Sequence, residues 1–292
     1  MTTPSATTAV RPSGQADEDR TDRLRAAAHR IRHNALQMGE VQGQGYIGQA
    51  LGVADILAVA YADQLRYRPA VPHWPGRDRF LLSIGHYAIA LYAALAEAGT
   101  IPVDELDTYG SDESRLPMSS MASYTPGVEI SGGSLGHGLT VATGMALGLR
   151  HVGNPARVFN LLSDGELDEG STWEAAMACA HHGLDNVTAI VDVNALQADG
   201  PTVGVLRTEP VVDKWRAFGW HATRVDGNDL RALVDAFDAA AAHSGSPSVI
   251  VCDTRIGCGV PLLMEREKAH FMRVEPDEWA IARAQLDEGF AR

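Results

Sequence analysis

The second half of the chain alternates short apolar runs with helix-length segments, and this alternation limits the possible folds more than any other feature. The apolar runs, rich in β-branched residues, cover 158–162, 187–193, 221–225 and 248–254. Between them, helices are predicted over 171–182, 213–218 and 229–243. Buried strands separated by helices are typical of a parallel sheet. We therefore predict an α/β fold, a doubly wound parallel sheet flanked by helices.

The first half of the chain predicts further helices and one further strand of the same fold. Helices are expected over 21–38 and 53–65, with a break in the glycine-rich stretch 39–52, and a strand over 79–83 leads to a helix ending at Glu97. Residues 100–131 have the composition of a loop, and 131–138 opens a helix that runs to Leu149. Residues 1–20 lack the apolar core of a signal peptide and predict a disordered tail. The expected single domain covers 21–292.

Charge and composition exclude several classes of protein. The formal charge is −13, with scattered Lys and Arg, so we expect no nucleic-acid partner, which needs a basic face. No apolar run reaches the ~18 residues of a membrane span, so no membrane contact is expected. Cys179, Cys252 and Cys258 form neither a disulfide framework nor a close metal pair, which indicates a reducing, cytoplasmic setting.

An acid and an amide follow two successive predicted strands. Asp164 begins the turn Asp-Gly-Glu, and Asn194 ends the run Asp-Val-Asn thirty positions later. If the strands are neighbours, both side chains lie at one edge of the sheet, where ligands of such sheets bind. Their oxygens suit Mg²⁺, Gly165 allows close approach of a diphosphate, and the next helix offers its N-terminus to anions. Taken separately, each piece is equally an ordinary turn or strand exit.

Together the pieces resemble the diphosphate motif of thiamine diphosphate enzymes, with Ser163 in place of the first Gly of Gly-Asp-Gly. Five blocks, in order, resemble transketolases over about residues 21–275. They are RDRFLLSIGHYAIALYAALAEAG, TPGVEISGGSLGHGL, SDGELDEGSTWEAAMACAHHGLDN, VDVNALQADGPT and KWRAFGWHATRVDGND. The resemblance implies the thiamine diphosphate-binding fold, in its diphosphate-binding (PP-type) form.

The resemblance also assigns the cofactor and metal site. It implies that Asp164, Asn194 and the Leu196 carbonyl hold Mg²⁺, or Ca²⁺ or Mn²⁺ in its place. The backbones of Gly165 and Glu166 would cradle the diphosphate. Asp192 would support the site by hydrogen bonding, and the alternative is a strand-end acid that faces water.

Further residues follow from the same resemblance. His86 and His270 would act in catalysis, and Gly133, Ser134 and Leu135 would line the cofactor rings. Glu169, as a catalytic and cofactor-binding residue, and Glu174 would lie at a subunit interface. As an alternative, these two acids only stabilise a helix N-terminus, by ~0.3–1 kcal/mol.

Two segments depart from the family pattern. Tyr46 stands where many transketolases have a His, and RLPMSSMASYTPGVE lacks the usual Gly-His-Pro. We therefore expect a sugar or sugar-phosphate substrate pair other than the usual pentose phosphates. Tyr46 and Arg115 are candidate substrate contacts, and either could equally be a plain loop residue.

A full transketolase chain also carries a pyrimidine-binding domain, whose glutamate activates the cofactor. The resemblance is therefore to the N-terminal subunit of a split transketolase, which is active only with a separate C-terminal subunit, in an α₂β₂ assembly. Such an enzyme moves a two-carbon ketol unit from a ketose or its phosphate to an aldose through a thiamine diphosphate carbanion. Alternatives are a subunit of a 2-oxo acid or acetoin dehydrogenase, and a non-catalytic cofactor-binding subunit. The Gly-x-Gly-x-x-Gly match at 43–48 follows no predicted strand and is weak evidence for a nucleotide site.

Overall fold

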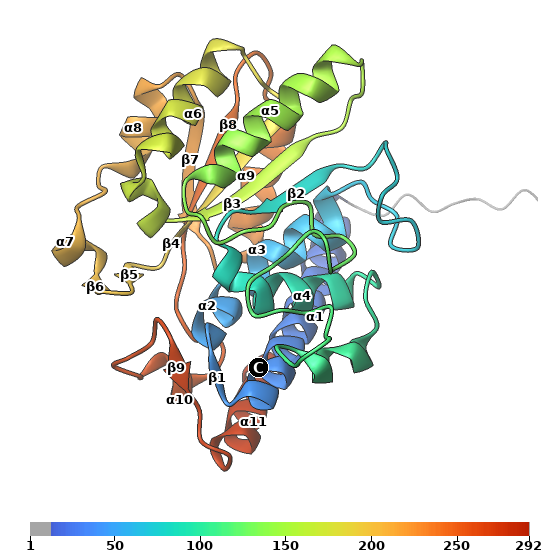
Figure 1. The fold of residues 1–292 in the computed structure, drawn as a ribbon, viewed down its shortest axis with the longest axis vertical. Coiled ribbons are helices and arrows are strands. Elements are labelled where there is room, and N and C mark those ends of the chain that lie inside the picture. The colour runs from blue at the N-terminus through green and yellow to red at the C-terminus, as the bar shows by residue number, and fades with distance from the viewer. Residues whose placement is uncertain (1–12, 292) are drawn as a thin grey trace, which may run out of the picture.

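A five-stranded sheet forms the centre of the computed structural model, which describes residues 13–291 (Figure 1). Its strand order is β2 (Arg79–Leu82), β3 (Val158–Ser163), β4 (Val187–Val193), β8 (Ser248–Asp253) and β7 (His221–Asp226). Every neighbouring pair is parallel. The predicted α/β fold with a parallel sheet is confirmed.

Helices cover both faces of this sheet because alternate strand residues point to opposite sides. In β3, Val158 and Leu162 belong to the core under α5 (His137–His151), α6 (Gly170–His181) and α8 (Val211–Ala217). Phe159 and Leu161 belong to the core on the other face. That second core packs against α1 (Ser13–Gln42), α3 (Ala54–Val59), α4 (Ala88–Glu97) and α9 (Leu230–Ala242).

The first helix is longer than the sequence predicts. Residues 1–12, part of the expected tail, lie outside the described residues, but α1 already begins at Ser13, so the expected tail is wrong for 13–20. Arg20 explains the difference, since it pairs with Asp63 and with Asp238 on α9. Polar anchors of this kind leave no apolar periodicity in the sequence.

The glycine-rich stretch 39–52 ends the first helix, as expected, because α1 stops at Gln42. It contains α2 (Ile47–Gly52), and α3 then continues into a π-helical turn, η1 (Ala60–Gln64). A Cβ on Gly48 would lie 2.5 Å from Ile256, and one on Gly52 would lie 3.0 Å from the Arg255 carbonyl oxygen. These glycines therefore allow α2 to pack closely against the 255–256 segment.

Several short elements and one further helix complete the chain, and the sequence did not predict them. β1 (Gln44–Gly45) pairs antiparallel with β9 (Met272–Arg273), and α10 (Pro261–Met264) and α11 (Glu278–Ala291) close the C-terminal part. The remaining pieces are β5 (Leu196–Gln197), β6 (Gly200–Pro201), α7 (Thr202–Val205), and the 3-10 turns η2 (Gly85–Tyr87), η3 (Val103–Thr108) and η4 (Gly165–Asp168). None of the helices within residues 13–291 is both long and apolar enough to cross a membrane.

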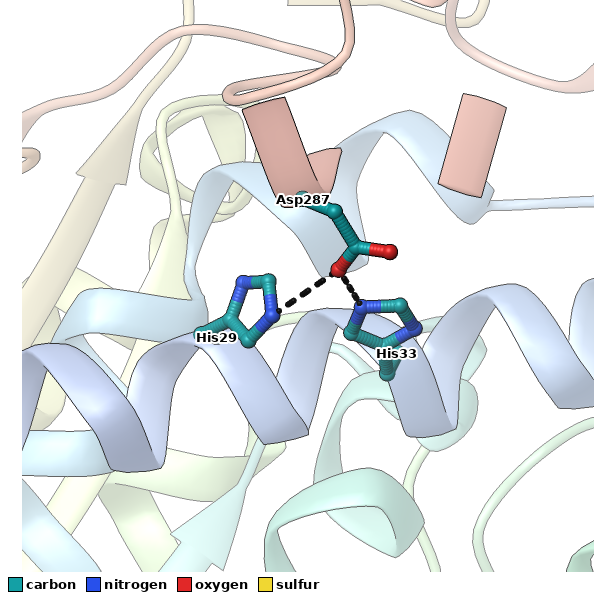
Figure 2. Close-up of side chains that lie close together, drawn as sticks. All are labelled: His29, His33 and Asp287. Carbon is teal, nitrogen blue, oxygen red and sulfur yellow. Dashed lines mark hydrogen bonds and ion pairs between the residues drawn. The ribbon is translucent and has the colours of Figure 1, made fainter. Parts of the chain in front are cut away.

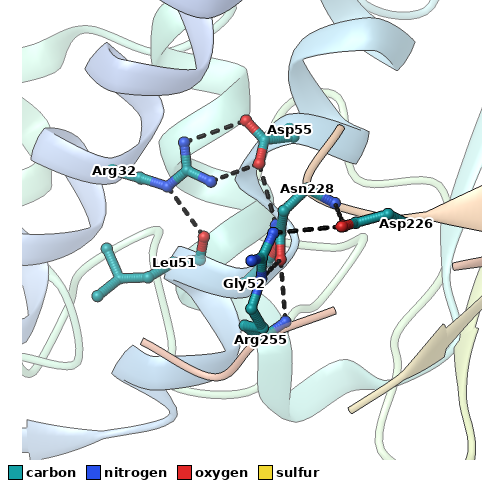
Figure 3. Close-up of polar contacts among 7 residues, drawn as sticks. All are labelled: Arg32, Leu51, Gly52, Asp55, Asp226, Asn228 and Arg255. Atoms are coloured by element: carbon teal, nitrogen blue, oxygen red, sulfur yellow. Dashed lines mark hydrogen bonds and ion pairs between the residues drawn. The ribbon is translucent and has the colours of Figure 1, made fainter. Parts of the chain in front are cut away.

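A buried ion pair joins the helical layer to the end of the sheet (Figure 3). Arg32 of α1 donates to both carboxylate oxygens of Asp55 and to the Leu51 carbonyl. Asn228, which follows β7, donates to Asp55 and accepts from the Arg255 backbone, which follows β8. Because β7 and β8 both end here, the network fixes α1 and α3 against the carboxyl ends of these two strands.

Candidate functional site

The pairing of β3 with β4 brings Asp164 and Asn194 to the same edge of the sheet. Ser163 is in register with Asp192, and the Asp164 backbone N–H donates to the Asp192 carbonyl at 2.9 Å. Asp164 and Asn194 line one cavity of about 330 Å³, together with Thr202, Thr208 and others. The strand neighbourhood on which the predicted site depends is therefore present.

Asn194 is held by the nitrogen end of its amide. Its Nδ2 donates to Asp192 Oδ2 at 2.7 Å and to the Tyr87 hydroxyl at 2.9 Å. Its Oδ1 accepts from the Leu196 backbone N–H at 3.1 Å. This oxygen keeps a second lone pair, so it is the atom that Asn194 offers to a cation.

Asp192 is the buried centre of this arrangement. It is fully buried and accepts from Tyr87 at 3.0 Å, from Asn194 and from the Thr254 hydroxyl. Burial raises its pKa, and the three hydrogen bonds oppose that shift. The alternative that Asp192 faces water is wrong, since its side chain is enclosed.

Asp164 is also buried, with three donors of its own. Its Oδ1 accepts from the Gly165 N–H at 2.8 Å, and its Oδ2 accepts from the Ala195 N–H at 3.0 Å and the Thr202 hydroxyl at 2.9 Å. Burial first, and then the charge of Asp192, raise its pKa to about 6. Two carboxylates this close and this buried favour a cation beside them.

Glu166 turns its side chain away from Asp164. Its Oε1 accepts from the Ser83 hydroxyl and from the Gly136 N–H at 2.7 Å, while its buried Oε2 has no partner. Burial raises its pKa to about 7. The carboxyl therefore ties β2 to the start of α5 and leaves the 164–166 backbone as the part that can face a ligand.

Two glycines bring the predicted ring-lining segment against the turn that carries His86. A Cβ on Gly85 would lie 2.3 Å from the Gly132 carbonyl carbon, and a Cβ on Gly132 would lie 2.4 Å from the Gly85 Cα. Neither position can hold a larger residue without moving backbone. The next residues are Gly133, with φ +121°, then the exposed Ser134 and the partly buried Leu135.

Tyr46 lies beside both predicted catalytic histidines, His270 through the β1–β9 pairing and His86 at the turn after β2. The Tyr46 ring lies 4.4 Å from that of His86 and 5.4 Å from that of His270, and the two imidazole centroids are 5.9 Å apart. Phe271 lies 5.2 Å from Tyr46. Gln49 donates to the His270 carbonyl at 2.6 Å.

Both imidazoles are kept neutral at ordinary pH. Burial, with His270 as a second cause, lowers the pKa of His86 to about 4. Burial also lowers the pKa of His270, while its hydrogen bond with the Leu196 backbone opposes the shift. A neutral imidazole can accept a proton, as a general base must.

The remaining predicted residues lie at the surface. Glu169 precedes α6 and Glu174 lies on it, and both are exposed. Arg115 forms a bidentate ion pair with Glu105, with a 2.8 Å contact from its Nε, so its charge is already matched. The loop-residue interpretation of Arg115 therefore fits the structure better than a substrate contact.

Several site residues were missed by the sequence interpretation. They are Ser83, Tyr87, Thr202 and Thr254, which donate to Glu166, Asp192 or Asp164, and Gln49, which holds His270. Tyr87 directly follows the predicted Gly-His and could have been found there. Ser83 and Thr202 lie inside two of the family-like blocks, but the sequence assigned them no role. Thr254 and Gln49 lie outside these blocks, and only the fold brings them to the site.

The donor set fits a hard divalent cation. Asp164 and Asn194 offer oxygen atoms, the Leu196 backbone is within the same turn, and both side chains are fixed by hydrogen bonds before any ligand arrives. The glycine contact between residues 85 and 132 leaves backbone, without side chains, beside His86. The parallel fold and this edge are those that the resemblance to thiamine diphosphate enzymes predicts.

The comparison with protein families names the family. A model described as transketolase, thiamine diphosphate binding domain, matches residues 24–291. The chain therefore belongs to the transketolase family. This confirms the predicted family and favours a transketolase subunit over a subunit of a 2-oxo acid or acetoin dehydrogenase.

Individual relatives agree with that family. The uncharacterized transketolase family protein y4mO of Sinorhizobium fredii is 64% identical, with 90% of this chain and 94% of that protein covered. The 6-deoxy-6-sulfo-D-fructose transketolase subunit SqwG of a Clostridium species is 37% identical, with 91% and 96% covered. One subunit of the apulose-4-phosphate transketolase of Actinobacillus succinogenes is also 37% identical, with 91% and 97% covered.

Solved transketolases share the fold. The enzyme from Campylobacter jejuni aligns with a TM-score of 0.84 at 29% identity over 90% of this chain and 42% of its own. The enzyme from Leishmania mexicana aligns with a TM-score of 0.78 at 29% identity, covering 92% of this chain and 45% of its own. The present chain thus spans less than half of each of these transketolases.

Proposed function

We propose that this chain is the diphosphate- and metal-binding subunit of a two-chain transketolase, which transfers a two-carbon ketol unit from a ketose or ketose phosphate to an aldose. One observation carries the proposal. Asp164 and Asn194 lie at the same edge of the sheet, and hydrogen bonds from the Asn194 amide nitrogen leave its oxygen available to a cation. The named relatives that are described as transketolase subunits have nearly the same extent as this chain, which supports a separate partner.

Different residues at this edge of the sheet would bind the metal, the diphosphate and the rings of the cofactor. Asp164, Asn194 and the Leu196 carbonyl would hold Mg²⁺, or Ca²⁺ or Mn²⁺, and Asp192 would fix the amide of Asn194. The backbones of Gly165 and Glu166 would face the diphosphate. Gly133, Ser134 and Leu135 would line the rings. When bound, thiamine diphosphate would supply the carbanion that carries the two-carbon unit.

The two histidines would handle protons at the substrate hydroxyls. His86 and His270 are neutral near pH 7 because burial lowers both pKa values. Each could therefore take a proton on an imidazole nitrogen during bond cleavage and return it afterwards. Glu169 would act at the interface with the partner, whose own glutamate would complete cofactor activation.

The partner would cover the outer side of α5 and α6. The exposed Glu169 and Glu174 lie just before and within α6, and Val141 of α5 and Met177 of α6 are 38% and 52% exposed. We propose an α₂β₂ assembly on this side, in the cytoplasm. The three cysteines, Cys179, Cys252 and Cys258, are free, as a reducing compartment requires.

The assignment of activity is tested by reconstitution. This chain, its partner subunit, Mg²⁺ and thiamine diphosphate together should consume a ketose donor, and either chain alone should not. Asp164→Ala should abolish turnover, while Asp213→Ala, at an exposed site on α8, should not. Turnover by this chain alone contradicts the two-chain proposal, and cofactor binding without turnover in the full assembly points to a non-catalytic subunit.

Tyr46 would shape the sugar site, since its ring contacts the rings of both His86 and His270. We expect Tyr46→His to move the kcat/KM preference toward pentose phosphates. Tyr46→Phe keeps the ring contacts and should keep the native preference. Measuring kcat/KM over a panel of ketose donors compares the two variants, and an unchanged ranking in Tyr46→His would remove Tyr46 from substrate selection.

A further inference from the structure

Two histidines of α1 and an aspartate of α11 converge on one point (Figure 2). His29 and His33 are four residues apart and therefore lie on one face of the helix. Asp287 reaches them from the C-terminal helix. None of the three belongs to the strands and turns that carry Asp164 and Asn194.

The ligand atoms are already close together. The Nε2 atoms of His29 and His33 lie 3.2 and 2.7 Å from the same oxygen, Asp287 Oδ1. All three atoms lie within 4.8 Å of one another. Figure 2 shows both imidazoles directed at that carboxylate oxygen.

These separations are near those of a tetrahedral metal site. Zinc bonds of about 2.0–2.2 Å to nitrogen and oxygen place neighbouring ligands about 3.4 Å apart. The His29 contact, at 3.2 Å, nearly meets this, and the His33 contact, at 2.7 Å, requires a small outward movement of the carboxylate. Asp287 can make that movement because its side chain is 60% exposed.

Neighbouring side chains fix one imidazole and neutralise the nearest cation. Phe290 stacks on His29 with ring centroids 4.1 Å apart, which fixes the ring. The positive charge of Arg32 is compensated by Asp55, its buried partner.

We infer that His29, His33 and Asp287 form a binding site for a divalent transition-metal ion such as Zn²⁺. Imidazole nitrogens with one carboxylate suit Zn²⁺ or Co²⁺, whereas Mg²⁺ prefers oxygen ligands. The exposed side of Asp287 leaves room for water as a fourth ligand. The ion would fasten α11 to α1, so this chain would carry a structural metal apart from the proposed cofactor site.

Co²⁺ provides a direct probe of this site. The full chain, stripped of metal, is titrated with Co²⁺ in excess Mg²⁺, which occupies the oxygen-rich edge at Asp164. We expect one Co²⁺ per chain with the visible absorption of a tetrahedral site, lost on adding Zn²⁺. His33→Ala and Asp287→Asn should each weaken binding by about tenfold or more. His151→Ala, an exposed histidine on α5, is the matched control and should bind normally.

A second measurement separates loss of ligands from loss of fold. Without metal, the variants and the wild-type chain should unfold at similar temperatures. Zn²⁺ should raise the unfolding temperature of the wild type and of His151→Ala only. If the wild type binds no Co²⁺ in excess Mg²⁺, or if His33→Ala and Asp287→Asn bind it equally well, the three side chains are only a hydrogen-bonded cluster and the inference is wrong.

Discussion

An amide binds a cation only through its oxygen, so the tethering of Asn194 decides what the sheet edge can do. Asp192 and Tyr87 hold the amide nitrogen, and this fixes which end of the amide remains available. Asp164 is fixed in the same way by two backbone N–H groups and Thr202. At the residue scale, the site is therefore preorganised by buried hydrogen bonds behind the proposed ligands.

This arrangement predicts the effect of Asp192→Asn. The buried carboxylate accepts three hydrogen bonds, and an amide would set its own N–H₂ group against at least one donor. Asn194 would lose its fixed orientation, and affinity for Mg²⁺ with thiamine diphosphate should fall by about 10–100-fold. Calorimetric titration measures this, with Asp235→Asn, at an exposed position on α9, as the control. Equal affinity in Asp192→Asn and wild type would rule out the tethering role.

A second residue-scale prediction concerns pH. In the folded chain the pKa of Glu166 is about 7, against an ordinary value of 4.5, because the carboxyl is buried. Between these values the folded state keeps a proton that the unfolded chain has lost, so this group's contribution to stability falls as pH rises through that window. Glu166→Gln cannot ionise and should gain stability relative to wild type, by up to about 3 kcal/mol, between pH 5 and pH 8.

Urea unfolding of the cofactor-free chain at several pH values measures this difference. Glu174→Gln, at an exposed helical position, is the control and should follow the wild type. A constant gap between Glu166→Gln and wild type at all pH values would mean that Glu166 ionises normally.

The sequence predicted those site residues that belong to a motif. Asp164, Asn194 and His86 each follow a predicted strand, and Tyr46 stands where the family pattern has a His. Thr202 could not be predicted, because it reaches Asp164 only through the hairpin formed by β5 and β6. Glu166 was expected to contribute backbone alone, and nothing in the sequence indicated that Ser83 and Gly136 would take up its side chain.

At the scale of helices and strands, the parallel sheet was predictable because its strands are continuous apolar runs. The β1–β9 pair was not, since each strand has two residues and its partner lies far along the chain. Yet this pair brings Tyr46 to His270. The start of α1 was also missed, because the ion pairs of Arg20, near this end of the helix, leave no apolar pattern. Local apolar periodicity reports burial, and it carries no information about such pairings.

Helix α5 gives a prediction at this scale. Gly144 lies on its exposed side, and an added Cβ would meet nothing within 4 Å. A glycine inside an exposed helix lowers stability by about 1 kcal/mol relative to a good helix former. Gly144→Gln should therefore raise the free energy of unfolding of the isolated chain and, if the partner covers α5, weaken assembly.

These opposite effects distinguish blocked assembly from damaged folding. Urea unfolding measures the free energy of unfolding of the isolated chain, and sedimentation of the reconstituted complex measures assembly. Ala239→Gln places the same side chain at an exposed position on α9, on the other face of the sheet, and should assemble normally. If Gly144→Gln assembles as well as this control, the partner does not cover α5.

At the scale of the whole molecule, the chain matches the thiamine diphosphate-binding part of transketolases that are more than twice as long. Its relatives of similar extent are named as subunits. The exposed apolar residues of α5 and α6 lie on one layer of the fold, outside the core that these helices cover. These facts together support an enzyme whose active site is completed by a second chain.

Native mass spectrometry of the complex, isolated from its own cells with Mg²⁺ present, tests that claim most directly. The account predicts a mass containing two copies of this 31.2 kDa chain, two copies of a second protein and two thiamine diphosphates. It also predicts that Asp164→Ala yields a complex without the cofactor. A chain found alone, or a complex in which the wild-type protein holds no thiamine diphosphate, would contradict the account.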